Sequence, residues 1–319
     1  MELNVHQGPV YACRFNNSGE FLASGGHDHK LVLWDMEELN EQLDEPNEIH
    51  PFVQPLHKSA ITSIRWSQLE NNIVFTSSAD NTACAFDIVK GVKIKTFRHK
   101  ECVNELDNGK RDTIVTVSDD GIGRIWDLRS KWPIAQVNTS YPLFTCCIDK
   151  NEEKIYWAGI DPTVNCLDLR KLASQTGEEC LLWKESCQSN SLTSLSLSPD
   201  NNFLLSKSID GSIKYFDTKI VDLGSNRKKS KPYVFDGPQS SDDDWLIRAR
   251  FIPNTKDDEL YTIASGSNDG FLFTWDFATR KLLDRKAGHR GAIFDVDYHL
   301  QRGKLATCSI DGSIILSNL

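Results

Sequence analysis

The chain has 319 residues, a formal net charge of −9 and charged residues mixed along its whole length. An acidic surface of this kind repels phosphate backbones, which argues against broad direct binding to nucleic acid. No run of about 18 apolar residues is present, so we expect no membrane-spanning helix. The nine cysteines are scattered without a C-x-x-C pair, a pattern typical of reduced thiols in the cytosol or nucleus.

Residues 114–129 hold the most informative stretch of the chain. Residues 114–117 are apolar or β-branched and predict a short strand, and residues 122–128 predict a second strand that contains Ile125 and Trp126. Between them lies Ser118-Asp119-Asp120-Gly121, whose Asp and Gly residues tolerate the backbone of a tight turn. The stretch therefore predicts a β-hairpin, and versions of it recur along the chain.

The repeat is marked by a turn aspartate that is followed seven residues later by a second acid or, in the last copy, by Asn. The seven pairs are Asp28 and Asp35, Asp80 and Asp87, Asp120 and Asp127, Asp161 and Asp168, Asp210 and Asp217, Asp269 and Asp276, and Asp311 and Asn318. A Ser or Thr stands four residues before six of these turn aspartates, and four copies carry an upstream histidine: His6, His57, His99 and His289.

This pattern resembles the WD repeat, whose period of about 40–45 residues corresponds to one four-stranded propeller blade. The resemblance implies an all-β, seven-bladed β-propeller over residues 1–319. In that family the turn Asp, the His ring, the hydroxyl and the Trp indole form a hydrogen-bonded chain, which satisfies polar groups in a buried place. Two complete sets are expected: His6, Ser24, Asp28 and Trp34, and His99, Thr116, Asp120 and Trp126.

A hydrolase triad is the competing interpretation of Ser24, His6 and Asp28. The same trio recurs in other repeats, however, and no G-x-S-x-G nucleophile elbow is present. A metal site at His27-Asp28-His29 is likewise explained more simply by turn residues of a repeat. The chain also lacks a Walker motif and a Gly-rich dinucleotide fingerprint. We therefore predict no catalytic residues, no metal and no cofactor.

The sequence outside the repeats predicts how the ring closes and where it is interrupted. Because the last repeat lacks a fourth strand, residues 2–5 are expected to supply it, which would protect a sheet edge. Residues 37–55 are acidic and predict a solvated loop, with a short helix at 36–43 as the alternative. Residues 220–245 form a longer charged insertion. Its basic residues, which predict a nuclear signal, a local RNA contact or simply a charged loop, are Arg227, Lys228, Lys229 and Lys231.

A propeller without a catalytic signature is usually an interaction platform, because loops on a rigid scaffold carry binding functions. The repeat register places the residue before each turn aspartate, and the residue near the start of each first strand, on the same face. Aromatic and Arg side chains there are expected to anchor a partner. The predicted partner-binding residues are Tyr11, His27, Asp119, Phe144, Ile160, Ile209, Arg248, Phe294 and Ile310.

Within the WD-repeat family, the chain is similar to the WD-repeat subunit of the U5 small nuclear ribonucleoprotein. The most specific segments are Asn138-Thr-Ser-Tyr141, Gly159-Ile-Asp161, Leu192-Thr-Ser-Leu-Ser-Leu-Ser198 and Leu246-Ile-Arg248. The resemblance implies a non-enzymatic nuclear scaffold, a monomer within a larger complex, that docks on the large U5 scaffold protein and contacts other spliceosomal proteins. The alternative is a substrate adaptor of a cullin ubiquitin ligase, because Asp127-Leu-Arg129 and Asp168-Leu-Arg170 resemble the Asp-x-Arg boxes of such adaptors.

Overall fold

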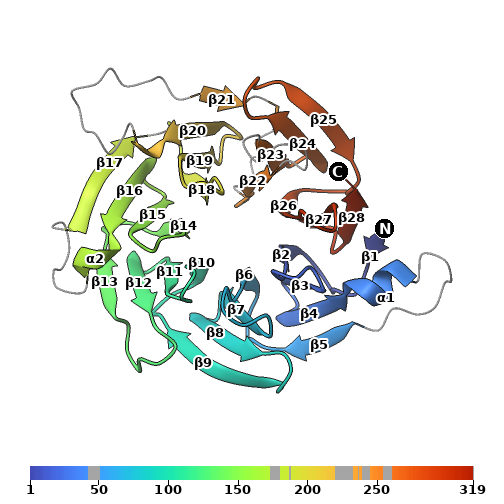
Figure 1. Ribbon diagram of the computed structural model, residues 1–319, viewed down its shortest axis with the longest axis horizontal. Helices are drawn as coiled ribbons and strands as arrows, with labels where there is room; N and C mark the ends of the chain where they lie inside the picture. Colours follow the sequence, from blue (N-terminus) through green and yellow to red (C-terminus); the bar gives the residue numbers. More distant parts are fainter. Residues whose placement is uncertain are drawn as a thin grey trace.

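The computed structural model describes residues 1–41, 51–172, 180–186, 188–219, 233–235, 237–238, 245–253 and 261–318. The described strands form seven antiparallel four-stranded sheets, arranged as blades around one central axis (Figure 1). This arrangement confirms the predicted all-β, seven-bladed propeller. The basic run Arg227, Lys228, Lys229 and Lys231 lies outside the described residues.

The two inner strands of each blade lie nearest the central axis (Figure 1). The innermost strands are β2 (Val10–Phe15), β6 (Ile61–Trp66), β10 (Val103–Asn108), β14 (Leu143–Ile148), β18 (Leu192–Leu197), β22 (Ala249–Pro253) and β26 (Ile293–His299). The second strands are β3 (Phe21–Gly26), β7 (Ile73–Ser78), β11 (Ile114–Ser118), β15 (Lys154–Gly159), β19 (Phe203–Ser208), β23 (Tyr261–Gly266) and β27 (Lys304–Ser309).

The two outer strands complete each blade toward the circumference (Figure 1). The third strands are β4 (Lys30–Asp35), β8 (Thr82–Asp87), β12 (Ile122–Trp126), β16 (Thr163–Asp168), β20 (Ile213–Asp217), β24 (Phe271–Asp276) and β28 (Ile314–Asn318). The outermost strands are β5 (Phe52–Pro55), β9 (Val92–Arg98), β13 (Ala135–Asn138), β17 (Leu181–Ser186), β21 (Tyr233–Phe235), β25 (Leu282–Ala287) and β1 (Glu2–Leu3).

Burial explains why the middle strands are rich in apolar residues. A blade packs against a neighbour on each side, so both faces of its middle strands are covered, and β7 and β11 are buried at every position. The outermost β25 is exposed at every position. Close packing also restricts side-chain size, because a Cβ added at Gly123 would lie 2.5 Å from the Trp157 ring of the next blade. The hydrophobic core therefore lies between blades.

The first strand of the chain closes the ring, as the sequence predicts. Leu3 pairs with Ile314 and Glu2 with Ile315, so β1 is the fourth strand of the last blade. The N-terminal ammonium of Met1 donates to the carbonyl of Leu316 at 2.9 Å. Figure 1 shows the two chain ends side by side in this blade. The closure pairs an edge that would otherwise expose the backbone groups of β28.

The expected solvated loop at 37–55 was wrong in part, and the alternative of a short helix is the one that the structure shows. Residues 36–41 form helix α1 (Met36–Glu41), which begins where Asp35 Oδ1 accepts the backbone N–H groups of Glu37 and Glu38, a typical N-terminal cap. Its Met36 and Leu39 side chains are buried against the closing blade, which a solvated loop would not provide. Residues 52–55 form β5. The 220–245 insertion likewise supplies β21. A second short helix, α2 (Leu169–Leu172), follows β16.

Candidate functional site

The turns between the second and third strands lie beside the starts of the innermost strands. In six blades, the residue before the turn aspartate donates its backbone N–H to a carbonyl just before the innermost strand. These pairs are His27 to Pro9 (2.8 Å), Ala79 to Ala60 (2.9 Å), Asp119 to Cys102 (3.0 Å), Ile160 to Pro142 (3.2 Å), Ile209 to Ser191 (3.0 Å) and Ile310 to Ala292 (2.9 Å). We call the face that carries both features the turn face.

In the first blade, four polar side chains form a continuous hydrogen-bonded chain. His6 Nδ1 lies 3.0 Å from Asp28 Oδ1, and His6 Nε2 lies 2.8 Å from Ser24 Oγ. Trp34 Nε1 donates to the same hydroxyl at 3.0 Å. Burial raises the pKa of Asp28, but the hydrogen bond and charge interaction with His6 and the backbone N–H groups of Gln7 and Lys30 together outweigh it, so the net pKa is lowered. Ser24 is fully buried, so its hydroxyl is out of reach of a substrate and the four side chains stabilise the blade.

The third blade departs from the predicted arrangement. The Arg124 guanidinium is inserted between His99 and Asp120, donating to His99 Nδ1 and forming a 2.9 Å ion pair with Asp120. Because Nδ1 accepts, the proton of a neutral ring is on Nε2, which donates to Thr116 Oγ1 at 2.9 Å. Trp126 Nε1 also donates to this hydroxyl, at 2.8 Å. The expected direct contact between His99 and Asp120 is thus replaced by Arg124, whose register position holds Val32 in the first blade.

The second blade shows what happens when the indole is missing. His57 Nδ1 lies 3.0 Å from Asp80 and Nε2 lies 2.8 Å from Thr76 Oγ1. Phe86 stands in place of the tryptophan, so the Thr76 hydroxyl is free of an indole donor and can accept a proton from Nε2. Burial alone lowers the pKa of His57, but hydrogen bonds to Asp80 and Cys84 overcome it and raise the pKa to about 9. This histidine is an imidazolium at neutral pH.

A set of buried and half-buried charged side chains, which we call the charged ring, crosses the central channel below the turn face. Arg248 Nε donates to Glu105 at 3.2 Å, and its Nη1 lies 3.5 Å from Asp295. Asp295 also pairs with Arg14 at 2.7 Å, and Glu105 with Arg65 at 3.2 Å. Further ion pairs join Arg65 to Asp107 at 2.8 Å and Arg250 to Asp295 at 3.4 Å. Each of these charges has a partner of opposite sign on another blade. Because a buried charge without a partner is costly, separating the inner strands would be unfavourable.

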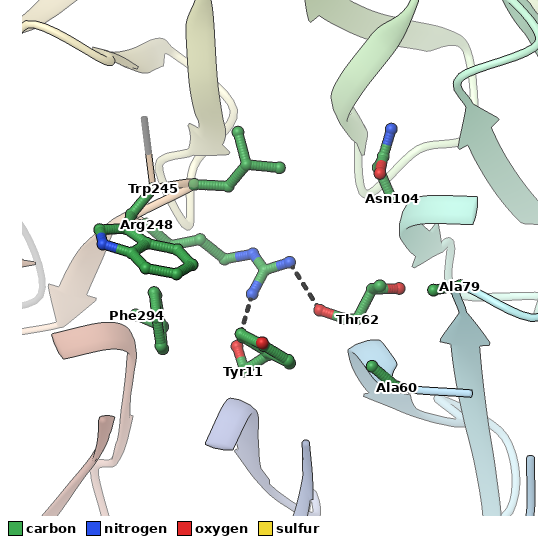
Figure 2. A pocket seen from close by; sticks show the side chains of 9 residues that line it. Tyr11, Ala60, Thr62, Ala79, Asn104, Trp245, Arg248 and Phe294 are labelled. Atoms are coloured by element: carbon green, nitrogen blue, oxygen red, sulfur yellow. Dashed lines mark hydrogen bonds between the residues drawn. The ribbon is translucent and has the colours of Figure 1, made fainter. Parts of the chain in front are cut away.

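Above this ring, a cavity of about 270 Å³ opens at the mouth of the channel on the turn face (Figure 2). Its lining residues are Tyr11, Ala60, Thr62, Ala79, Asn104, Trp245, Leu246, Arg248 and Phe294. The Phe294 ring packs against Tyr11 and Trp245, with centroid separations of 5.1 and 5.4 Å. Arg248 extends across the cavity, where its Nη1 donates to the Tyr11 carbonyl and its Nη2 to the Thr62 carbonyl, each at 2.9 Å (Figure 2). We call this cavity the mouth pocket.

The repeats match the family model described as "WD domain, G-beta repeat" at residues 1–35, 51–87, 180–217 and 280–316. The chain is a WD-repeat protein. Over its full length it is 29% identical to "Pre-mRNA-splicing factor cwf17" of Schizosaccharomyces pombe, covering 87% of that protein. It is 29% identical to "U5 small nuclear ribonucleoprotein 40 kDa protein" of Dictyostelium discoideum and 26% identical to the Homo sapiens protein of that name, covering 84% and 83% of them. These proteins are its homologues.

The structure brings three of the predicted partner-binding residues of this WD-repeat protein into the mouth pocket: Tyr11, Arg248 and Phe294. Two of the three are more buried than expected of surface anchors, since Phe294 is 2% and Arg248 6% exposed. Arg248 is buried where its guanidinium pairs with Glu105 and Asp295, so it belongs to the charged ring as well as to the pocket.

The remaining predicted partner-binding residues are distributed around the turn face. Ile160 is 49% exposed, and His27 is exposed as well. The half-buried residues are Asp119, Phe144, Ile209 and Ile310. Ile310 packs against the Phe294 cluster, and Asp119 accepts a 2.7 Å hydrogen bond from Asn104. Of these six residues, Ile160 is the most exposed apolar side chain.

Sequence reasoning missed Trp245 and Leu246, which contribute to the wall of the mouth pocket. They precede the innermost strand of the sixth WD-repeat blade and follow an acidic run, so we assigned Trp245 to the end of a charged insertion. An isolated tryptophan among polar residues was the available signal, because aromatic side chains are enriched at binding sites.

The two arginines of the Asp-x-Arg boxes each pair with the aspartate of their own box. Arg129 contacts Asp127 at 2.8 Å and its side chain is 90% exposed. Arg170 contacts Asp168 at 3.1 Å and Glu153 at 3.4 Å. Two more findings concern the described residues only: no helix is long and apolar enough to cross a membrane, and no His, Cys, Asp and Glu cluster could hold a metal ion.

Proposed function

We propose that this WD-repeat protein is a non-enzymatic interaction scaffold of the U5 particle in pre-mRNA splicing, acting in the nucleus. The observation that carries the proposal is homology over the entire chain to proteins named as a U5 small nuclear ribonucleoprotein subunit and as a pre-mRNA-splicing factor. The homology extends through all seven blades, so it includes the turn face as well as the shared repeat core. It favours the splicing scaffold over a cullin adaptor.

Within that role, the chain docks on the large U5 scaffold protein through its turn face. The mouth pocket and the exposed Ile160 supply apolar contact area on this face, and such contacts at the centre of an interface carry most of its binding energy. Direct RNA contact is confined to the basic run Arg227, Lys228, Lys229 and Lys231, because the overall charge is −9. We expect that contact to weaken steeply with salt.

Affinity purification of the tagged chain from nuclear extract at moderate salt tests this function. We expect to recover U5 RNA together with the large U5 protein. Recovery of a cullin and its linker protein without U5 RNA would contradict the proposal.

The face is tested with a matched pair of substitutions. Ile160→Asp on the turn face should reduce recovery of the large U5 protein. Leu69→Asp should leave recovery unchanged, because Leu69 is 66% exposed in the turn between β6 and β7, at the opposite end of the strands. Equal recovery with both variants would rule out the turn face as the docking surface.

A further inference from the structure

The residues that line the mouth pocket restrict the kinds of side chain that can bind there. We propose that it seats one large apolar side chain of an extended segment of the protein partner, with an acidic residue of the same segment next to it, and that it rejects a cationic anchor. This inference rests on the proposed function, because it specifies how a partner is held at the turn face. It adds a binding site and the type of side chain that the site selects.

The walls favour an apolar anchor. Tyr11, Trp245, Phe294 and Leu246 line the pocket together with two alanines, and burial of apolar area against such walls is the main source of affinity. The cavity measures about 270 Å³, slightly below the range of about 300–1,000 Å³ typical of sites for whole small molecules. A single side chain fits this volume better than a metabolite or cofactor.

The floor of the pocket determines the charge preference. Arg248 is the only charged residue among those that line it. Its contacts with Glu105, Asp295, Tyr11 and Thr62 involve Nε, Nη1 and one Nη2–H, and no described residue accepts the second Nη2–H. A guanidinium has five N–H groups, so this one can donate to a ligand carboxylate. An incoming Lys or Arg would instead meet a like charge.

Two rim alanines allow the pocket to be tested without disturbing the charged ring below it. Ala79 and Ala60 are half-buried and belong to the loops of the second blade. Ala79→Trp should fill the pocket, whereas Leu69→Trp places the same side chain at the opposite end of the strands. Ala60→Asp and Ala60→Lys place opposite charges at the rim. Thermal melting of each variant establishes that the fold is retained before binding is compared.

The probe is a set of short overlapping peptides covering the large U5 protein, with binding to the full chain measured by fluorescence polarisation. We expect the bound peptides to contain a large apolar residue beside Asp or Glu, and replacement of the apolar residue by Ser to weaken binding at least about tenfold. Ala79→Trp should weaken binding to a similar extent, and Leu69→Trp should not. Ala60→Asp should weaken it more than Ala60→Lys, and added salt should reduce this difference.

Three outcomes would overturn the inference: unchanged peptide affinity with Ala79→Trp, stronger binding to Ala60→Asp than to Ala60→Lys, or bound peptides anchored by Lys or Arg. The experiments distinguish an error in the pocket assignment from an error in the proposed function. If the wild-type chain recovers U5 RNA and the large U5 protein but the pocket variants recover them equally well, the scaffold role stands and the pocket assignment is wrong. If the wild-type chain recovers neither, the scaffold role itself is wrong.

Discussion

His57 and His99 occupy equivalent positions in neighbouring blades, but their rings are held in opposite protonation states. Asp80 accepts directly from His57, whereas the Arg124 guanidinium separates His99 from Asp120. Burial and the charge of Arg124 lower the pKa of His99 to about 3, against the opposing effect of Asp120. The pKa of His57 is raised to about 9. The equivalent ring is thus positively charged in the second blade and neutral in the third, where the long side chain of Arg124 reaches it.

The two histidines should titrate at opposite ends of the pH range in an NMR experiment on imidazole carbon–proton shifts. The His57 signal should change as pH rises through about 9, and the His99 signal should stay that of a neutral ring down to the acid limit of folding. The Arg124→Leu variant should raise the pKa of His99, because Asp120 then acts on the ring without an intervening cation. A His99 signal that titrates near its ordinary pKa in the wild type would contradict the arrangement.

These shifts have opposite consequences for stability. The stabilising contribution of His57 is fully present below its unfolded-state pKa of about 6.5 and is lost as pH rises through about 9. For His99 the contribution is present above about 6.5 and declines as pH falls toward 3, because only the unfolded state binds the proton in that window. Urea unfolding at a series of pH values should compare each variant with the wild type. The stability difference for His57→Gln should shrink as pH rises through about 9, and that for His99→Gln should shrink as pH falls toward 3.

Lys207 should make the protein more stable as pH rises above neutrality. The side chain is buried between the fifth and sixth blades, where Nζ lies 2.6 Å from Ser265 Oγ and 2.7 Å from the Gly266 carbonyl. Burial lowers its pKa to about 7, so above that pH the folded state has released a proton that the unfolded state still binds. Stability then rises by up to about 1.4 kcal/mol per pH unit. Lys207→Met should lack this rise, and the exposed Lys58→Met should retain it; parallel curves for all three proteins would refute the assignment.

Glu105 should be a sensitive position of the charged ring. Its carboxylate pairs with both Arg65 and Arg248 and is 1% exposed. Glu105→Gln preserves the shape but leaves two buried guanidinium groups with reduced compensation, which typically costs about 3–5 kcal/mol. Chemical denaturation should show a loss of that order, whereas Glu101→Gln on the surface of the same blade should stay within about 0.5 kcal/mol of the wild type.

Strand β1 should contribute to the stability of the whole ring. Leu3 is 2% exposed and packs in a cluster with Ile314, Leu316 and the α1 residues. Leu3→Ala should therefore cost about 2–5 kcal/mol, and deletion of residues 1–5 should lower the melting temperature further because β28 becomes an edge. The exposed Asn4→Ala variant provides the control. A truncated chain that melts at the wild-type temperature would show that closure of the last blade is dispensable.

Arg129→Ala combined with Arg170→Ala should leave both the melting temperature and the recovery of U5 components unchanged. Both side chains are largely exposed and paired with the adjacent aspartates, and exposed ion pairs contribute little to stability. A loss of cullin-linker recovery in this double variant, seen against a wild-type chain that recovers the linker, would restore the adaptor hypothesis.

The repeat pattern was sufficient to predict the blades, because each turn aspartate fixes a tight turn and the apolar strands on either side must be buried. Closure by residues 2–5 followed from a count of strands, and β1 confirms it. Register along a strand was thus readable from spacing. How far a side chain extends into the channel could not be predicted from spacing. Arg248 and Phe294 were predicted to lie on the rim, and both are buried.

The same limit explains the misassigned third blade. Spacing places His99 and Asp120 at the correct positions, but it cannot show that Arg124, on the neighbouring strand, is long enough to enter between them. The mouth pocket was only partly predicted for a related reason. Trp245 and Leu246 lie outside the repeat consensus, so no periodicity marks them, and only the three-dimensional arrangement brings them beside Tyr11 and Phe294.

The pairing of Met1 with Leu316, residues 315 positions apart, has a consequence for folding during synthesis. A ribosome delivers β1 first and its partner β28 last, so the N-terminal strand must wait unpaired while six other blades form. Contacts between residues so far apart in the sequence slow folding, because the entropic cost of closing the loop comes before the contact can stabilise the chain. In a nascent chain β1 therefore stays unpaired until β28 has been synthesised.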